Sequence, residues 1–236
     1  MFNGKKVVGI VPKAPVFGRG ENAYGDAYTF ADTYVTRAKE AGLLPVGVLP
    51  VNERISTDVP DLCDAFIIQG GAGVRPFHLD LIDHAVKNGK KVLGICLGCQ
   101  AIHTYFSVRE ILREQGLDTA PGDYYADVIG NKNIFLEGVE GHRPFDGLPR
   151  GDLDWIKHPV KLDPDSNLAR ILGVTEVQGA SIHVYRIKTP APGEKVTGRA
   201  EDGTVEVIEV GDKIIGTQFH PDVDSLLHRV FDWLGE

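Results

Sequence analysis

The sequence is poor in cysteine, and this scarcity narrows the possible protein classes. Among 236 residues there are three cysteines, at positions 63, 96 and 99. An odd and small number of cysteines is unsuitable for a disulfide scaffold, which needs several pairs. We therefore expect reduced thiols, as in a cytoplasmic protein.

The sequence also lacks a basic excess and any long apolar run. The formal net charge is −8, and acidic and basic residues are mixed along the chain. No lysine-rich or arginine-rich stripe favours nucleic acid or an anionic membrane surface. No stretch approaches the roughly 20 apolar residues of a membrane span, and the first residues lack a signal peptide's apolar core. We expect a cytoplasmic protein without nucleic-acid or membrane partners, acting on a small polar molecule.

What is present is enough apolar sequence for a substantial core, since hydrophobic residues make up 42% of the chain. No repeat, low-complexity segment or linker interrupts it, so a single domain over 1–236 is predicted. Apolar β-branched runs alternate with helical spacing, which predicts a mostly parallel α/β sheet with helices on both faces. The predicted strands are 6–12, 43–50, 64–70 and 90–95, and the predicted helices are 24–41, 78–89 and 96–115.

The second half of the chain has a different pattern. Residues 117–156 are rich in Gly, Pro and Asp without clear periodicity, and we expect an irregular insertion or lid there. Strands are predicted at 157–163 and 181–187, and Ser166 is expected to cap a short helix. Residues 204–219 alternate, turn at Gly211-Asp212 and alternate again, which predicts an antiparallel hairpin. The tail from Val223 to Leu234 has apolar residues on one helical face, so one packed helix is expected.

The segment GICLGCQ, residues 94–100, permits two interpretations. As Cys-x-x-Cys it is a candidate redox pair. A structural metal site is poorly supported, because no second Cys-x-x-Cys or His-x-x-His is present. As Gly-x-Cys-x-Gly it is a candidate nucleophile turn, with Cys96 following a buried strand and opening a helix whose amides favour thiolate. Cys99 is then expected to pack in the core.

A cysteine nucleophile needs a base and an orienting carboxylate, and GTQFHPD at 216–222 supplies candidates. His220 ends an apolar strand, and Asp222 can hold its imidazole. The two side chains meet if their strands are neighbours in the sheet. The bare loop Gly70–Gly73, together with the amide of Leu97, is a candidate oxyanion hole.

These three segments together resemble the class I glutamine amidotransferase superfamily, and within it the gamma-glutamyl-gamma-aminobutyrate hydrolase-like peptidases. The resemblance covers most of the chain except roughly 104–156. Gly94, Cys96, Gly98 and Gln100 match the family's elbow in full. Three differences stand out from the family pattern. Gly73 replaces an Asp of the oxyanion loop, Asp222 replaces a Glu, and of a late Ser-x-His-His-Gln motif only Ser181 and His183 remain.

The resemblance implies a flavodoxin-like fold and a cysteine-dependent amidohydrolase that cleaves a γ-glutamyl amide through a γ-glutamyl thioester. It implies Cys96, His220 and Asp222 as catalytic residues, and the amides of Gly71 and Leu97 as the oxyanion hole. Gly70, Gln100 and His183 are the implied substrate-binding residues. No metal and no organic cofactor are implied.

Other functions remain open at this point. The chain could be a glutaminase subunit that supplies ammonia to a separate synthase, or a binding module that has lost catalysis. A Cys96/Cys99 redox pair is the remaining alternative. The sequence names neither the leaving amine nor the oligomeric state, and a homo-oligomer is possible.

Overall fold

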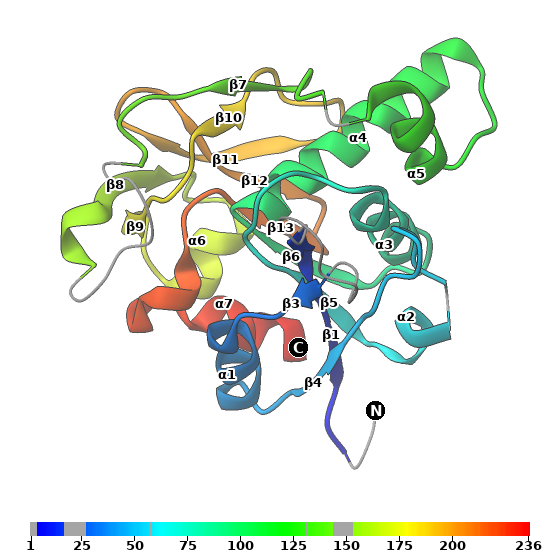
Figure 1. Cartoon of the computed structure of the whole chain (residues 1–236). Coiled ribbons are helices and arrows are strands. Elements are labelled where there is room, and N and C mark those ends of the chain that lie inside the picture. The colour runs from blue at the N-terminus through cyan, green and yellow to red at the C-terminus, as the bar shows by residue number, and fades with distance from the viewer. Residues whose placement is uncertain (1–3, 17–26, 57, 131, 144–152) are drawn as a thin grey trace.

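The computed structural model describes residues 4–16, 27–56, 58–130, 132–143 and 153–236. Within these residues the chain builds one large sheet with helices on both faces (Figure 1). The helices are α1 (Asp32–Glu40), α2 (Asp58–Leu62), α3 (Pro76–Lys87), α4 (Leu97–Gln115), α5 (Pro121–Tyr124), α6 (Asn167–Leu172) and α7 (Arg229–Asp232).

The large sheet has nine strands in the described residues. In spatial order they are β4 (Leu44–Gly47), β1 (Val7–Val11), β5 (Ala65–Ile68), β6 (Lys91–Ile95), β13 (Ile214–Thr217), β12 (Val205–Val210), β11 (Lys195–Ala200), β8 (Lys157–Leu162) and β9 (Glu176–Ala180). The strands from β4 to β13 are parallel, and those from β12 to β9 add on antiparallel to their neighbours. The predicted α/β class and the predicted C-terminal hairpin, formed by β12 and β13, are confirmed.

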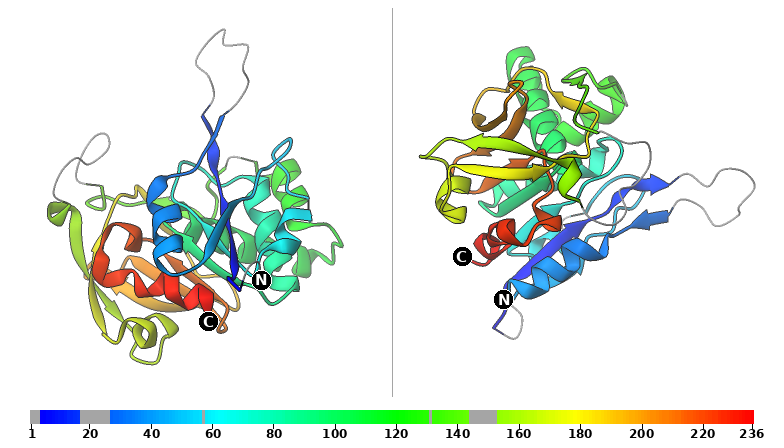
Figure 2. Two further views of the ribbon diagram at one scale, coloured as in Figure 1. Left: turned by 90° about the horizontal axis from the view of Figure 1, so that it is seen from below. Right: turned by 90° about the vertical axis from the view of Figure 1, so that its left-hand side faces the viewer.

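Two apolar cores cover the two faces of this sheet. One contains the inward side chains of α3 and α4, including Phe77, Ile82 and Ile102. The other contains those of α1, α6 and α7, including Tyr34 and Phe231. Figure 1 and both views of Figure 2 place α1 and α7 on one side of the parallel strands and α3 and α4 on the other. The near-continuous apolar strands predicted from the sequence are therefore buried on both faces, as parallel strands are.

Several predicted elements differ from the observed ones. The helix expected over 24–41 begins only at Asp32, because Ala27–Thr29 form β3, paired with β2 (Lys13–Val16). Residues 24–26 of that prediction lie outside the described residues. The side chain of Gln69 accounts for the late start, since it accepts from the N–H of Ala31 and donates to the carbonyl of Thr29.

The expected tail helix is broken into short turns. One-turn 3-10 segments at Pro221–Val223 and Ser225–Leu227 precede α7, and another follows at Trp233–Gly235. The carboxylate of Asp224 accepts from the N–H of Leu226 and so caps a new turn within the predicted helix. Most of the predicted apolar face survives, because Val230 and Phe231 are fully buried, but Leu226 is 81% exposed and the prediction is wrong there.

The segment 117–156 is not wholly irregular in its described part. It contains α5, a π-helical turn at Tyr125–Ile129, and β7 (Leu136–Gly138), which pairs with β10 (Tyr185–Ile187). The strand predicted over 181–187 is thus limited to its last three residues. Ser166 caps α6 by accepting from the N–H of Ala169, as predicted.

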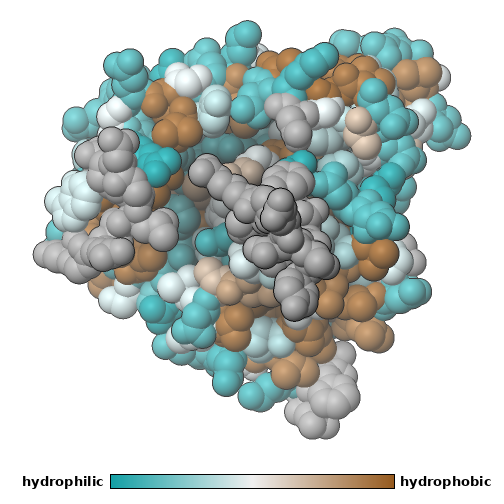
Figure 3. All heavy atoms as spheres, viewed as in Figure 1, coloured by the Kyte–Doolittle hydropathy of each residue, from teal (hydrophilic) through white to brown (hydrophobic). Residues whose placement is uncertain are grey.

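Among the described residues no helix is both long enough and apolar enough to cross a membrane. The space-filling view shows hydrophobic side chains gathered at the lower right, over the region of β4 and α2 (Figure 3). Leu62 of α2 and Val51 are the most exposed of the large apolar residues there.

Candidate active site

Cys96 lies at the turn between β6 and α4, at the carboxyl edge of the parallel strands. Its backbone has φ 55° and ψ −103°, a left-handed conformation that is strained for a residue with a side chain. Such strain is typical of a nucleophile elbow. The Cys96 N–H donates to the carbonyl of Thr217 at 2.7 Å, which fixes the turn against the end of β13.

The two glycines of the elbow are required by close packing. A Cβ on Gly98 would lie 2.1 Å from the carbonyl oxygen of Ile68, and one on Gly94 would lie 2.5 Å from the carbonyl oxygen of Gly98. Neither position can hold a larger residue without a backbone shift. Close packing is therefore the steric reason for the two glycines of the Gly-x-Cys-x-Gly pattern.

His220 lies shortly after the end of β13, at Thr217, and reaches the same edge. Because β13 and β6 are parallel neighbours with Thr217 opposite Ile95, the two strand ends bring His220 beside Cys96. A Cβ placed on Gly70 would lie 2.9 Å from Cε1 of His220 and 3.4 Å from Cβ of Cys96. Cys96, His220 and the Gly70 loop thus converge on one point, as their places at the strand ends led us to expect.

Asp222 holds the outer nitrogen of the His220 ring. The distance from His220 Nδ1 to Asp222 Oδ1 is 3.1 Å, so the shorter side chain of Asp spans the gap. Burial lowers the pKa of His220, but the Asp222 carboxylate and the Cys96 sulfur raise it more, to about 10. Burial raises the pKa of Asp222, and the His220 imidazole outweighs this and lowers it. The imidazole is therefore stabilised in its protonated form.

Helix α1 supports this pair through residues that no sequence motif indicated. The hydroxyl of Thr33 donates to Asp222 Oδ2 at 3.3 Å, and Arg37 Nε donates to the Asp222 carbonyl at 3.1 Å. The spacing of the sequence places Tyr34 only on an apolar helix face, yet its hydroxyl accepts the Gly70 N–H at 3.1 Å. A tyrosine in an apolar stripe gives no sequence signal for this role.

The candidate oxyanion loop lies against the start of α4. A Cβ on Gly71 would lie 3.0 Å from the side chain of Leu97, so the two residues are adjacent. Leu97 is the first residue of α4, and its N–H has no carbonyl one turn earlier within the helix. Gly73 has φ 95°, a conformation that glycine adopts without strain.

The two cysteines of the elbow lie on opposite faces of the sheet. Cys96 belongs to the core of α1, α6 and α7, whereas Cys99 belongs to the core of α3 and α4 and packs on Gly216. All three cysteines are free thiols. Burial raises the pKa of the Cys99 thiol well above its usual value. The burial of Cys99 in the other core does not favour the redox-pair alternative, and the expected core position of Cys99 is confirmed.

Two of the predicted substrate-binding residues are occupied by protein contacts. The Gln100 amide donates to the carbonyl of Tyr185 and to the side chain of Gln218. His183 Nδ1 lies 3.0 Å from the same Tyr185 carbonyl, and its other nitrogen faces His142. These contacts favour positioning roles for both residues.

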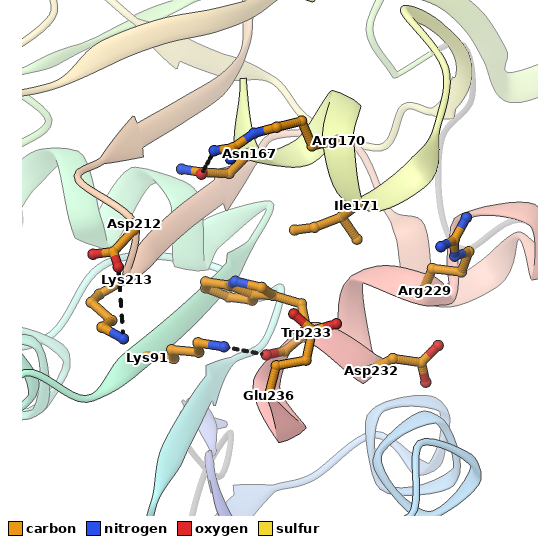
Figure 4. Close-up of a pocket in the computed structure, with 10 residues that line it drawn as sticks. All are labelled: Lys91, Asn167, Arg170, Ile171, Asp212, Lys213, Arg229, Asp232, Trp233 and Glu236. Atoms are coloured by element: carbon orange, nitrogen blue, oxygen red, sulfur yellow. Dashed lines mark hydrogen bonds and ion pairs between the residues drawn. The ribbon is translucent and has the colours of Figure 1, made fainter. Parts of the chain in front are cut away.

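A cleft of about 450 Å³ lies at the other edge of the sheet (Figure 4). Lys91 and Lys213, which line it, stand at the amino ends of β6 and β13, whereas Cys96 and His220 follow their carboxyl ends. Lys91 donates to the carbonyl of Trp233, as the dashed line in Figure 4 marks. This cleft is remote from the nucleophile and forms no part of the candidate active site.

The fold, together with Cys96 and His220 at the carboxyl ends of the parallel strands, defines a class I glutamine amidotransferase-like protein. Comparisons with known proteins agree. A glutamine amidotransferase of Thermotoga maritima superposes with a TM-score of 0.57 at 13% identity, covering 96% of this chain and 81% of its own. A protein of Thermoplasma acidophilum, described as a component of a GMP synthase, has a TM-score of 0.56 at 17% identity, covering 98% and 93%. At such identities the likeness concerns the fold alone.

Sequence comparison identifies the family. The Peptidase C26 family matches residues 77–222, and the chain belongs to it. A Schizosaccharomyces pombe protein named "Putative glutamine amidotransferase PB2B2.05" is 30% identical over 223 residues, covering 84% of this chain and 77% of that protein. A CTP synthase of Mycobacterium sp. is 30% identical over 180 residues, which are 69% of this chain but only 30% of that enzyme. These relatives support amide hydrolysis of the glutamine type as the general class of function.

Proposed function

We propose that the chain is a cysteine-dependent amidohydrolase that cleaves a γ-glutamyl amide bond, in glutamine or in a γ-glutamyl amine. The observation that carries the proposal is the strained turn at Cys96. It lies beside the His220–Asp222 pair and beside the oxyanion loop that contains Gly71, which contacts Leu97. A thiol, a protonated imidazole and free helix-terminal amides are the groups that acyl transfer needs.

In this mechanism the Cys96 sulfur attacks the γ-carbonyl carbon of the substrate. The carbonyl π electrons move to oxygen, and the N–H groups of Gly71 and Leu97 stabilise that oxyanion. His220, held by Asp222 through Nδ1, then gives its proton to the leaving nitrogen as the C–N bond breaks. Ammonia or an amine leaves, and a γ-glutamyl thioester remains on Cys96.

Water completes the reaction. His220, now neutral, takes a proton from a water molecule as its oxygen attacks the thioester carbonyl. The C–S bond breaks, glutamate leaves, and the thiolate–imidazolium pair is restored. Asp222 keeps the ring oriented in both halves of the reaction, and Gly70 shapes the loop that receives the glutamyl group.

A second candidate function is a glutaminase component that serves a separate synthase. It is favoured by the CTP synthase relatives, of which the chain covers less than a third, and by the structural neighbour described as part of a GMP synthase. A lapsed binding module of the same fold is the remaining alternative. A homo-oligomer stays a prediction.

The experiment is a release assay for ammonia and amines over glutamine and a panel of γ-glutamyl amines. Wild type is compared with Cys96→Ala and with the matched control Cys99→Ala. We expect turnover on at least one substrate, its loss by roughly 10³-fold or more in Cys96→Ala, and its retention in Cys99→Ala. The preferred substrate separates glutamine from a γ-glutamyl amine.

Undiminished turnover in Cys96→Ala would contradict the proposed mechanism. Absence of turnover over the whole panel would favour the synthase component or the binding module. Labelling of Cys96 by a glutamine-like electrophile then separates these two, since only a competent nucleophile reacts.

A further inference from the structure

A second cluster of imidazole and carboxylate groups lies at the same edge of the sheet. It consists of His142, His183 and Glu206, and all three are buried. His142 Nδ1 is 3.1 Å from His183 Nε2, and Glu206 Oε1 is 3.2 Å from the first and 3.3 Å from the second. Three potential ligand atoms therefore form a nearly equilateral triangle.

The outer nitrogens of both rings face acceptors. His183 Nδ1 lies 3.0 Å from the carbonyl oxygen of Tyr185, and His142 Nε2 lies 3.2 Å from the carboxylate of Asp202. A neutral imidazole carries one N–H, and when the outer nitrogen donates it to such an oxygen, the inner nitrogen is left with a lone pair. In that tautomer the lone pairs of His142 Nδ1 and His183 Nε2 face each other. Metal-bound histidines are usually held in this way by an acceptor on their outer nitrogen.

Glu206 adds a buried negative charge to these lone pairs. It is 0% exposed, and in the described part of the chain no backbone N–H, hydroxyl or amide donates to its carboxylate. Nε2 of His158 lies 3.6 Å from Oε1, somewhat further away than the inner nitrogens of His142 and His183. Burying a carboxylate among acceptors is unfavourable unless a cation lies between them.

The triangle has the size of one face of a zinc coordination sphere. With metal–ligand distances of about 2.0–2.1 Å, the ligands of a tetrahedral site are about 3.3 Å apart. The observed separations of 3.1, 3.2 and 3.3 Å approach that edge length. We infer that His142, His183 and Glu206 bind one Zn²⁺ ion, a site that no motif in the sequence indicates.

The donor set favours zinc over other divalent ions. Two imidazoles with one carboxylate suit Zn²⁺, whereas Mg²⁺ and Ca²⁺ prefer oxygen ligands. His142 lines a cleft of about 290 Å³ together with His158 and Asp202, and this cleft is the candidate path for the ion from solvent. His158 Nε2 has no hydrogen-bond partner among the described residues and is the protein's candidate for the fourth position.

The alternative occupant is a proton. Burial lowers the pKa of His142, but Glu206 and Asp202 raise it more, so a protonated ring would also relieve the repulsion. Zinc binding at neutral pH would then displace that proton. The two occupants are distinguished by metal stoichiometry and by proton release.

The position of the cluster connects it to the active site. The main-chain carbonyl of Ala180 accepts the N–H of His220 at 2.9 Å, and His183 lies three residues further along. Glu206 lies in β12, where its carbonyl accepts the N–H of Gln218. An ion at this site would join three chain segments around the backbone that carries His220, and we expect it to stabilise the native state.

The test begins with full-length protein, stripped by a chelator and titrated with ZnCl₂. We expect one zinc per chain by elemental analysis, and a rise in Tm of about 5–10 °C at a hundredfold excess over Kd. Glu206→Gln and His183→Asn should bind zinc at least tenfold more weakly and lose this Tm shift. His228→Gln, a histidine beside Phe231 and outside the cluster, is the matched control and should bind as wild type.

Two further measurements keep the proposal falsifiable if a ligand variant misfolds. Wild type loaded with Co²⁺ should show visible d–d bands without thiolate charge transfer. Cys96→Ser should retain the same stoichiometry, because Cys96 is not a ligand. Zinc bound equally by wild type and Glu206→Gln, or lost in Cys96→Ser, would overturn the site. Neither result depends on whether the amidohydrolase proposal holds.

Discussion

The two imidazole–carboxylate clusters at the carboxyl edge of the sheet differ in where their histidines point. At the candidate active site one imidazole stands between Asp222 and the Cys96 thiol, and it can carry a proton from one group to another. In the second cluster, His142 and His183 turn their inner nitrogens toward the same carboxylate oxygen. One ring between a carboxylate and a nucleophile is suited to proton transfer, and two rings around a carboxylate are suited to a cation.

The largest expected effect that separates the two clusters comes from removing the carboxylate charge of Asp222 at the candidate active site. Asp222→Asn leaves the size of the side chain unchanged but no longer fixes the Nδ1–H tautomer of His220. We expect kcat/KM to fall by about 10²–10⁴-fold, while zinc binding keeps its stoichiometry. Steady-state kinetics and zinc titration of the same preparation measure both. A loss of zinc in Asp222→Asn would contradict the separation of the two clusters.

The pH profile sharpens the comparison next. Because the pKa of folded His220 is raised to about 10, the protonated imidazole persists through neutral pH. We expect kcat/KM to fall as pH rises through about 10. In Asp222→Asn this alkaline limb of the pH–rate profile should move to lower pH. In Glu206→Gln the limb should stay near its wild-type position. An alkaline limb near the ordinary histidine pKa of about 6.5 in wild type would show that His220 is not held as a cation.

The same pKa shift has a consequence for stability. An unfolded histidine has a pKa of about 6.5, so the stabilisation from protonated His220 is complete below that pH. It is lost as pH rises toward about 10. The lowered pKa of Asp222 acts in the opposite range, and its contribution is present above about pH 3.9 and lost as pH falls. Urea unfolding at pH 6 and pH 10 tests the His220 contribution, and the free energy of unfolding should be lower at pH 10.

The smallest expected effect is that of Tyr34→Phe. This change removes the hydroxyl that accepts the Gly70 N–H and leaves a buried donor without a partner. We expect a loss of about 1–3 kcal/mol in the free energy of unfolding and a reduction in kcat/KM smaller than that of Asp222→Asn. Zinc affinity should not change, because Tyr34 contributes no ligand to that site. A variant with wild-type stability would show that the Gly70 loop does not depend on this bond.

The sequence allowed prediction of the elbow because its chemistry is local. Gly94, Cys96 and Gly98 stand within five residues, and the pairing of β6 with β13 brings His220 to them. The second cluster could not be predicted in this way, because His142, His183 and Glu206 come from three distant segments. They meet only after β12, which carries Glu206, pairs antiparallel with β13. The chain from the end of β9 onward must also bond to the backbone of His142 and His220, which brings His183 beside His142. No spacing in the sequence records such a meeting.

The predicted helices show the same limit. Residues 78–87 and 97–115 are helical as their periodicity indicates, since each packs one apolar face on the sheet. The spacing of residues 24–41 is equally helical, but the Gln69 side chain binds the backbone at Thr29 and Ala31 and ends that regularity. A tertiary hydrogen bond from a residue some 40 positions away overrides a local preference there.

The placement of the three thiols decides how the protein responds to oxidants. Cys63 and Cys99 both lie in the core of α3 and α4, and Cys96 lies alone on the other face of the sheet. A sulfenic acid formed on Cys96 therefore meets no second thiol of its own chain with which to condense. Its repair requires a small thiol from solution, and without one, continued exposure to peroxide carries this sulfur on to its irreversible oxidation states.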